Sequence, residues 1–385
     1  MKTKFLNESS KTAKSLNSHI DLPFLFLVIA LSVFGTLMVF SAGYAYADFR
    51  YGDSAYFIKK QTIWLVAGIA VMILSSKINP MVYKLLTPLL YGITLVLLLL
   101  VLIIGFVGNG AQRWISIGPL TIQPSEIAKL TMLMMLAYYF SKNEGRIIDK
   151  QSNKNVFIFG TLIPFGIILL PTLLVMLQKH LSCIIILGTI GVILIVLSGA
   201  GTKYLSMFMG TGIAGVCYIA FFTDYTKERI TVWQNPEAYK LTGGWQTLQG
   251  LMAIGSGGLF GMGYGKSILK YCYVSEPAND MIFAILCEEL GLVGAFSAML
   301  LFALLVMRGV KIGLCAKDTY TRLLALGISV KMATQVLLNI AVVTNTIPNT
   351  GISLPFFSYG GSSLVMLFFE MGIMLSISRH SRIQK

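Results

Sequence analysis

The chain has 385 residues, of which 56% are hydrophobic and only 12% are charged, and its formal net charge is +14. A soluble domain needs far more charge to cover its surface, so this composition excludes an ordinary soluble protein and predicts an all-α polytopic membrane protein. The Lys and Arg residues alternate with the apolar runs and form no basic stripe interleaved with aromatic residues, which argues against a nucleic-acid partner.

Apolar runs of about 20 residues match the hydrocarbon thickness of a bilayer at the helical rise. Such windows predict about ten transmembrane helices, at 22–41, 61–75, 85–104, 126–141, 156–177, 181–199, 204–222, 281–306, 323–343 and 363–378. The first span follows a polar leader and has no small-residue cleavage site, which argues against a cleavable signal peptide. The predicted organisation is a cytoplasmic tail at 1–21, one membrane domain at 22–378 and a cytoplasmic tail at 379–385.

The orientation follows from Lys and Arg counts in alternate loops, because these residues accumulate on the cytoplasmic side. The set of segments that includes both tails holds 18 Lys and Arg, whereas the other set holds 10 although it contains the longest loop. We therefore expect both termini in the cytoplasm. Three unusual loops then face outside: 105–125, the large loop 223–280 between spans seven and eight, and 344–362. Binding and catalysis tend to sit on such loops.

Polar side chains within the predicted spans need a reason, because they are costly in a bilayer. Glu126 and Lys129 lie three residues apart on one helix face, where they can pair. The pair fits either a functional site or a buried ion pair that fixes helix packing. Lys331, Gln335 and Asn339 recur every four residues, so this stripe must face protein or a wet cavity.

Other notable side chains lie near the outer loops. Arg113 stands beside Trp114, which suits an interfacial anchor, while the arginine is equally suited to bidentate binding of a phosphate. His180 in a short outer turn and Glu370 in the last span have no partner that the sequence identifies. The five cysteines form no CxxC motif and no metal-ligand spacing, so they are assigned no function.

The large outer loop is rich in glycine and contains Gly265-Lys266-Ser267. A phosphate-binding loop requires glycine five positions before the Gly of Gly-Lys-Ser, and Phe260 occupies that position. The loop also faces away from cytosolic ATP. We expect its glycines to let the backbone approach the membrane surface and a bulky ligand closely. Asp280, at the outer end of the eighth span, is either a simple helix cap or a general base.

Three segments together resemble the FtsW/RodA/SpoVE group, the SEDS family of peptidoglycan polymerases. They are residues 110–115 with Gln123-Pro124-Ser125-Glu126 and Lys129, then residues 249–261 with 280–284 and 288–291, and finally residues 348–363. Their order and spacing hold over about residues 20–380. Many members have Gln-Pro-Asp-Leu-Gly after the fifth span. This chain has 178–182 as Gln-Lys-His-Leu-Ser, so no role is carried over to that segment.

The resemblance implies polymerisation of lipid II, an undecaprenyl-pyrophosphoryl disaccharide-pentapeptide, at the outer face of the cytoplasmic membrane. The implied partners are a class B penicillin-binding protein, which is a transpeptidase, and other membrane proteins of the divisome or elongasome. The essential aspartate of the family falls at Asp280, and its Glu and Lys map to Glu126 and Lys129. Residues 354–358 favour the FtsW or sporulation type, acting in cell division or wall growth.

The implied donor is already activated as a pyrophosphate ester, so the reaction needs no ATP. Conversion of an α-linked donor into a β-1,4 bond requires inversion, and we predict that Asp280 takes the proton of the attacking hydroxyl. Positive side chains or a divalent cation, magnesium or manganese, would face the leaving pyrophosphate, and the sequence identifies no metal ligands. The candidate substrate-binding residues are Arg113, Trp114, Glu126, Lys129, Arg229, Lys266, Lys270, Ser358, Gly360 and Gly361.

Two other classes of function stay open at this point. One is a flippase or transporter of lipid-linked precursors, whose path would be lined by intramembrane residues such as Glu126, Lys129 and Lys331. The other is a non-catalytic scaffold for the division machinery. A transporter needs polar groups at the midplane of several spans. The predicted midplane is mostly apolar, and the unusual residues cluster outside, which favours the enzyme.

Overall fold

The computed structural model describes residues 20–108, 111–118, 120–148, 157–199, 210 and 224–381. In this part of the chain, seven helices are long and apolar enough to cross a membrane. They are α2 (Leu22–Tyr51), α3 (Tyr56–Lys77), α4 (Pro80–Ile104), α8 (Ile163–Leu177) with the preceding π-helical turn η1 (Ile158–Leu162), α13 (Ile282–Leu314), α14 (Thr319–Val343) and α15 (Gly361–His380). The predicted all-α polytopic fold is confirmed.

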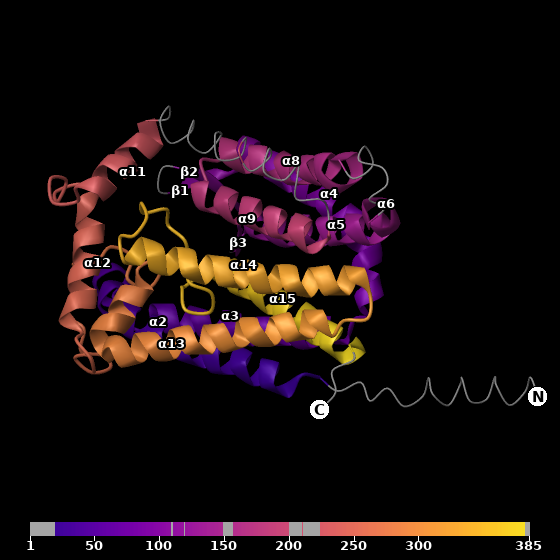
Figure 1. Ribbon diagram of the computed structural model, residues 1–385. Coiled ribbons are helices and arrows are strands. Elements are labelled where there is room, and N and C mark those ends of the chain that lie inside the picture. Colours follow the sequence, from indigo (N-terminus) through magenta and orange to yellow (C-terminus); the bar gives the residue numbers. More distant parts are fainter. Residues whose placement is uncertain are drawn as a thin grey trace, which may run out of the picture.

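Two further helices, α5 (Pro124–Lys142) and the shorter apolar α9 (Leu181–Leu197), match the fourth and sixth predicted spans. A short helix, α6 (Glu144–Ile148), follows α5. The long helices run side by side as a bundle (Figure 1). The predicted span 204–222 lies outside the described residues, so the count of ten stays a prediction.

The helix ends follow local capping chemistry. Asp21 accepts a hydrogen bond from the Phe24 N–H at 2.9 Å, with a proline in the first turn of α2. Asn79 caps α4 in the same way through the Met81 N–H, again before a proline. These are the residue types favoured at helix starts. The second predicted span, 61–75, was too short at both ends, because α3 continues through polar residues to Tyr56 and Lys77.

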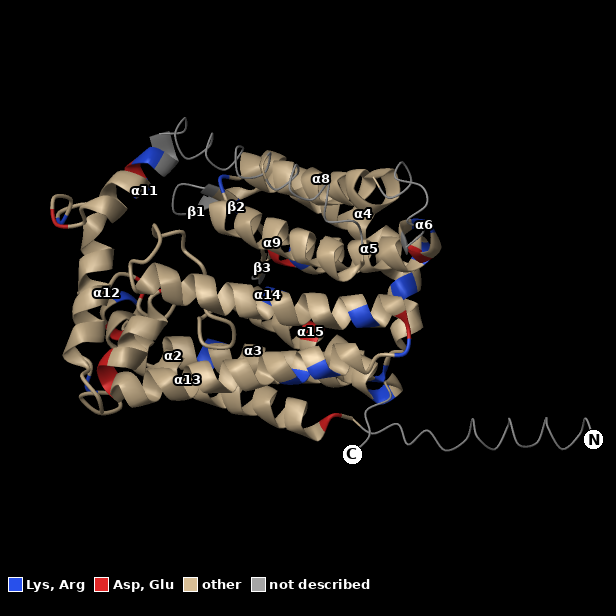
Figure 2. Ribbon diagram, in the orientation of Figure 1, with Lys and Arg blue, Asp and Glu red and all other residues tan. Residues whose placement is uncertain are grey.

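The first and last described helices meet at one end of the bundle. The Asp21 N–H donates to the Ser378 hydroxyl at 3.2 Å, and Arg308 of α13 forms an ion pair with Asp21 at 2.9 Å. Figure 2 shows Lys and Arg residues gathered at this end of the bundle. The start of α2 and the end of α15 therefore lie on one side of the bundle, as expected if both termini are in one compartment. That this side is cytoplasmic is an inference from charge.

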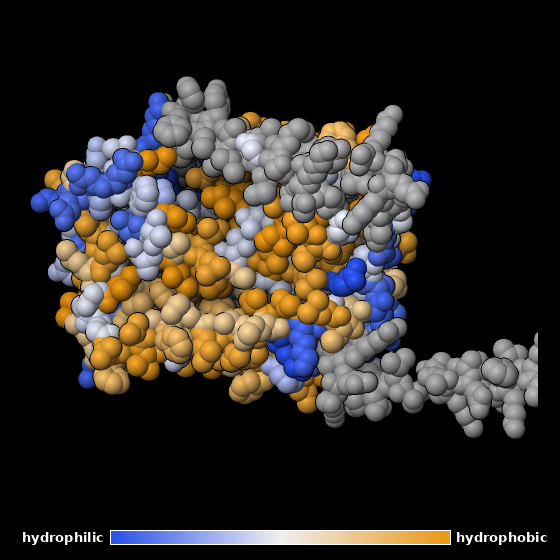
Figure 3. All heavy atoms as spheres, in the orientation of Figure 1, coloured by the Kyte–Doolittle hydropathy of each residue, from blue (hydrophilic) through white to orange (hydrophobic). Residues whose placement is uncertain are grey.

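The surface between the two ends is largely apolar, as Figure 3 shows. Along α13, for example, Leu292, Phe296 and Met307 are each more than half exposed. Large apolar side chains exposed along a helix suit a lipid environment, where the bundle needs no polar coat.

The first outer loop, predicted at 105–125, contains a small antiparallel sheet, for which the sequence analysis made no prediction. Its strands β1 (Phe106–Gly108), β2 (Ala111–Ile117) and β3 (Leu120–Ile122) pair in the order β1-β2-β3. The sheet lies at the far end of α4 from the termini (Figure 1). It leads directly into α5, so it fixes the start of that helix.

The large outer loop contains two helices, α11 (Asp224–Gln234) and α12 (Gly244–Ser256), followed by a glycine-rich segment. This segment packs against a break in α13 at Gly291, where φ is 64° and ψ is −163°. The Met262 N–H donates to the Glu288 carbonyl at 2.9 Å, and the Leu292 N–H donates to the Gly258 carbonyl at 3.0 Å. A Cβ at Gly261 would lie 2.2 Å from a carbonyl oxygen of α13. These glycines therefore allow contact with another helix, which corrects our expectation of a ligand.

A buried polar cluster holds the glycine-rich segment in place. Lys270 and Glu289 form an ion pair at 3.0 Å, and both side chains are almost fully buried. The Ser41 hydroxyl of α2 donates to Glu289 at 2.6 Å. Glu288 accepts from the Ser267 hydroxyl at 2.5 Å. The cluster thus links the segment to α2 and α13.

Replacing Lys270 by methionine is expected to destabilise the protein strongly, because Glu289 would keep a buried charge without its cation. Loss of one partner of a buried pair costs about 3–5 kcal/mol. Thermal unfolding of the purified protein in detergent measures the change. Lys266→Met is the matched control, since Lys266 is exposed on the same segment. Equal unfolding temperatures for the two variants would contradict a stabilising role for the pair.

Candidate functional site

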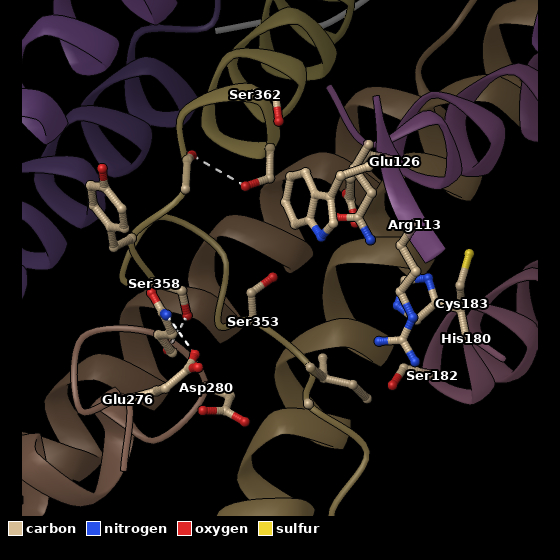
Figure 4. A pocket seen from close by; sticks show the side chains of 18 of the residues that line it. Arg113, Glu126, His180, Ser182, Cys183, Glu276, Asp280, Ser353, Ser358 and Ser362 are labelled. Atoms are coloured by element: carbon tan, nitrogen blue, oxygen red, sulfur yellow. Dashed lines mark hydrogen bonds between the residues drawn. The ribbon is translucent and has the colours of Figure 1, made fainter. Parts of the chain in front are cut away.

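A cavity of about 1090 Å³ lies among the ends of the helices opposite the termini. Its walls come from the sheet, from α3, α5, α9 and α12, from the loop before α13 and from the segment before α15. Figure 4 shows Asp280, Glu276 and Ser358 on one side and Arg113, His180 and Cys183 on the other. The predicted site residues that line it are Asp280, Arg113, Trp114, Glu126, Lys129, Arg229, Ser358, Gly360 and Gly361.

Asp280 lies two residues before α13 and does not cap that helix. Its half-buried carboxylate accepts hydrogen bonds from the Gln246 amide at 3.3 Å, and its backbone carbonyl accepts from Asn339 at 3.0 Å. Burial, followed by the negative charge of Glu276, raises the pKa of Asp280 to about 7, against the opposing effects of Gln246 and Arg229. A carboxylate that titrates near neutral pH is suited to general base catalysis.

The segment before α15 is hydrogen-bonded to the residues that precede Asp280. The Ser358 hydroxyl donates to the Asn279 carbonyl at 2.6 Å and accepts from the Leu354 N–H at 2.7 Å. The Tyr359 N–H donates to the Ala278 carbonyl at 2.8 Å. The hydroxyl of Ser358 therefore holds two loops together, and its contact with substrate stays a prediction.

Gly361 also has a packing role. A Cβ at this position would lie 2.3 Å from the indole of Trp64, which lines the cavity from α3. The glycine thus permits close approach of α3 and α15 at the cavity wall. Neither Trp64 nor the neighbouring Lys60 was identified from sequence, since both lie at the start of an ordinary apolar run.

The opposite wall is built around the start of α5. Glu126 and Lys129 pair at 2.7 Å with both side chains largely buried, as their spacing predicted. His180, at the start of α9, lies 3.3 Å from the Ser125 hydroxyl through Nδ1. Burial and the positive charges of Arg113 and Lys129 lower the pKa of His180 to about 3, so its ring is neutral. The sequence singled out His180 but gave it no partner, because Ser125 is distant in the chain.

Arg113 projects from β2 into the cavity and donates to the Lys179 carbonyl at 2.5 Å. Arg229 of α11 donates to the Asn349 carbonyl on the side of Asp280. The cavity therefore presents cations both beside the carboxylate and across from it. Such an arrangement can hold an anion near a proton acceptor.

Lys266 and Lys270 do not line the cavity. Lys270 is committed to the buried pair with Glu289, and Lys266 lies on the outer surface of the glycine-rich segment. Both lysines are therefore left out of the site. Sequence reasoning placed them there only because they share a loop with Asp280.

The polar stripe of α14 reaches the cavity from inside the bundle. Lys331 pairs with Glu370 of α15, which supplies the partner that the sequence did not identify. Gln335 donates to the Ser353 carbonyl at 3.1 Å, and Asn339 donates to the carbonyls of Asp280 and Ile352. The stripe thus faces protein and the cavity, as predicted. It ties α14 to α15, to the loop before α13 and to the segment before α15.

No group of three or more His, Cys, Asp or Glu side chains in the described part of the chain could hold a metal ion. A divalent cation therefore has no protein-only cage among these residues.

We expect the rate of the reaction in this cavity to depend on pH. If Asp280 must be ionised to accept a proton, the rate should rise about tenfold per pH unit below its pKa, about 7, and level off above it. Initial rates between pH 5.5 and 8.5 at saturating substrate measure this dependence. A rate that is constant across this range would contradict a titrating base at Asp280.

The fold and the cavity define a polytopic membrane protein with an enzyme-like site at one end of its helices. A family model described as "Cell cycle protein" (FtsW/RodA/SpoVE) matches residues 22–383. The chain is 39% identical to stage V sporulation protein E of Bacillus subtilis, over 94% of this chain and 98% of that protein. It is 34% identical to the peptidoglycan glycosyltransferase MrdB of Escherichia coli, over 94% and 95% of the two chains.

A solved structure extends the comparison to three dimensions. It is described as "Structural coordination of polymerization and crosslinking by a peptidoglycan synthase complex", and it matches with a TM-score of 0.78 and 26% identity, over 94% of this chain and 98% of that one. The chain therefore belongs to the FtsW/RodA/SpoVE family and is a multi-pass protein of the cytoplasmic membrane.

Proposed function

We propose that this protein polymerises lipid II into glycan strands at the outer face of the membrane, with Asp280 as general base. The protein is a peptidoglycan glycosyltransferase. The position of Asp280 is the observation that supports its proposed role as general base. Its carboxylate faces a large cavity, its pKa is raised to about 7 by burial and by Glu276, and cations lie on the opposite wall.

The proposed reaction is a direct displacement. A sugar hydroxyl of the acceptor attacks the anomeric carbon of the donor while the bond from that carbon to the pyrophosphate breaks. The hydroxyl proton passes to the Asp280 carboxylate, and the electron pair of the broken bond leaves with the lipid pyrophosphate. A base of this kind contributes roughly 10²–10⁴-fold to the rate.

We place the leaving pyrophosphate towards Arg113, Lys129 and Lys60. Arg113 supplies planar donors that suit a phosphate, and Lys129 adds a buried positive charge beside Glu126. Trp114 lines the same wall and offers an apolar face to the substrate. Any magnesium or manganese ion would then enter the site bound to the pyrophosphate oxygens of the substrate.

We further propose a class B penicillin-binding protein as partner, with other membrane proteins of the divisome or elongasome. The related structure is described as coordinating polymerisation and crosslinking in one complex, and this chain matches it over nearly its full length. The relatives include a sporulation protein and a peptidoglycan glycosyltransferase, so the proposal does not choose between a role in sporulation and one in division or wall growth.

An assay with purified protein and labelled lipid II tests the proposal, with and without the transpeptidase partner. Glycan strands on a gel are the expected product. Translocation of lipid II in vesicles without strands would instead support a flippase. Stimulation of another polymerase with neither activity would support a scaffold.

A further inference from the structure

The Asp280 carboxylate lies at the end of a hydrogen-bonded chain of two side-chain amides. Nε2 of Gln246, from α12, lies 3.3 Å from each carboxylate oxygen. Nδ2 of Asn349 donates to Oε1 of Gln246 at 3.2 Å. Oδ1 of Asn349 in turn accepts from the backbone N–H of Gly351 at 3.1 Å. Gln246, Asn349 and Gly351 all line the cavity.

The donor and the acceptor of each of these hydrogen bonds are fixed, because a backbone N–H can only donate. The Gly351 N–H therefore holds Asn349 with its oxygen towards Gly351 and its NH₂ towards Gln246. The Gln246 oxygen must then face Asn349, which leaves the Gln246 NH₂ to donate to Asp280. Turning either amide around would set two donors or two acceptors against each other, at a cost for each unmade bond.

We propose that Gln246 is a positioning residue that holds Asp280 in its proton-accepting form, and that Asn349 fixes the donating orientation of Gln246. Hydrogen bonds to a carboxylate favour its ionised state. The importance of this for catalysis rests on the proposed function of Asp280. The hydrogen bonds that link Asn349, Gln246 and Asp280 do not rest on that proposed function, because the geometry alone defines them.

Two charged side chains also act on the carboxylate. Glu276, in the loop before α13, opposes its ionisation, and Arg229 of α11 favours it. Asn339 of α14 is uncharged and contacts Asp280 through the backbone carbonyl of that residue, not through its carboxylate. Arg229 donates to the backbone carbonyl of Asn349. Asn349 therefore contacts both Gln246 and this nearby cation. Gln246 is the group whose side chain bonds the carboxylate directly.

The experiment measures protonation of Asp280 without using activity. Dicyclohexylcarbodiimide reacts with protonated carboxyl groups, and mass spectrometry of the peptides reports labelling at Asp280 as a function of pH. We expect a midpoint near the pKa of about 7 in the unmodified protein. Gln246→Leu should raise this midpoint by about one unit, because hydrogen bonds to a charged group are lost.

Gln335→Leu is the matched control. It makes the same change in the same cavity, but Gln335 donates to the Ser353 carbonyl rather than to Asp280. The pH midpoint of labelling at Asp280 should be unchanged in Gln335→Leu. If Gln246→Leu does not accumulate as folded protein, Gln246→Asn withdraws the amide by one methylene and should raise the midpoint in the same direction.

Asn349→Asp tests the direction of the hydrogen bonds between Asn349, Gln246 and Asp280. The new carboxylate still accepts from Gly351 but cannot donate to Gln246, so the Gln246 amide turns and presents its oxygen to Asp280. The midpoint should rise through this turn and through the added charge. In the Gln246→Leu background only the effect of the charge remains, so Asn349→Asp should raise the midpoint less there.

Unchanged midpoints in both Gln246 variants would overturn the inference, as would equal effects of Asn349→Asp in the two backgrounds. The pH–rate profile of polymerisation, measured on the same variants, separates this inference from the proposed function. A raised labelling midpoint with an unmoved rate profile would support the amide chain and overturn Asp280 as the base.

Discussion

Asp280→Asn is expected to lower the rate of lipid II polymerisation by roughly 10²–10⁴-fold, the usual contribution of a general base. Asparagine keeps the shape of the side chain but cannot accept the proton of the attacking hydroxyl. The backbone contact to Asn339 does not depend on the carboxylate, so the fold should persist. Initial rates with labelled lipid II measure the loss.

Two controls make the result specific to the proton. The thermal unfolding temperature of Asp280→Asn should stay close to that of the unmodified protein, and binding of lipid II should persist. Glu276→Gln, which removes the other carboxylate near the site, should lower the Asp280 pKa and shift the rate profile to lower pH. Polymerisation at an unchanged rate by folded Asp280→Asn would refute the assignment.

Gly291→Ala is expected to destabilise the protein by on the order of 4 kcal/mol, through backbone strain and overpacking together. The φ of 64° and ψ of −163° at this residue belong to a region that only glycine occupies readily. A Cβ there would also lie 2.4 Å from the Gly261 nitrogen. Thermal unfolding in detergent measures the effect, and polymerisation should fall as the Asp280 loop loses its support.

Gly255→Ala is the matched control, because it lies in α12 close to the same segment and a Cβ there meets nothing within 4 Å. Alanine should be tolerated at this helical position or stabilise it slightly. Equal unfolding temperatures for the two variants would show that the break in α13 does not require glycine.

The sequence was sufficient for the helices and for most of the site. Long apolar runs depend only on local composition, and the pairing of Glu126 with Lys129 depends only on helical spacing. The motif resemblance brought Arg113 and Asp280 to one cavity, although they are far apart in the chain. Such long-range proximity could not come from periodicity.

What the sequence did not predict depends on tertiary contacts. The sheet at 106–122 has strands too short for a clear alternation, and α11 and α12 are short helices within a polar loop. Lys270 and Glu370 each found a partner in a distant segment. A charged residue gives no sign in sequence of whether it will face a substrate or a buried counter-ion.

The break at Gly291 separates α13 into two parts with different surroundings. Residues 282–289 are all buried, whereas Leu292, Val293 and Phe296 beyond the break are exposed on the apolar surface of the bundle. A helix that meets a thicker or thinner bilayer adjusts by tilting. The carbonyls of Glu288 and Glu289 hold the buried part of α13 to the glycine-rich segment, so we expect this part to keep its place when the lipid-facing part tilts. Turnover should then depend little on the acyl-chain length of the surrounding membrane.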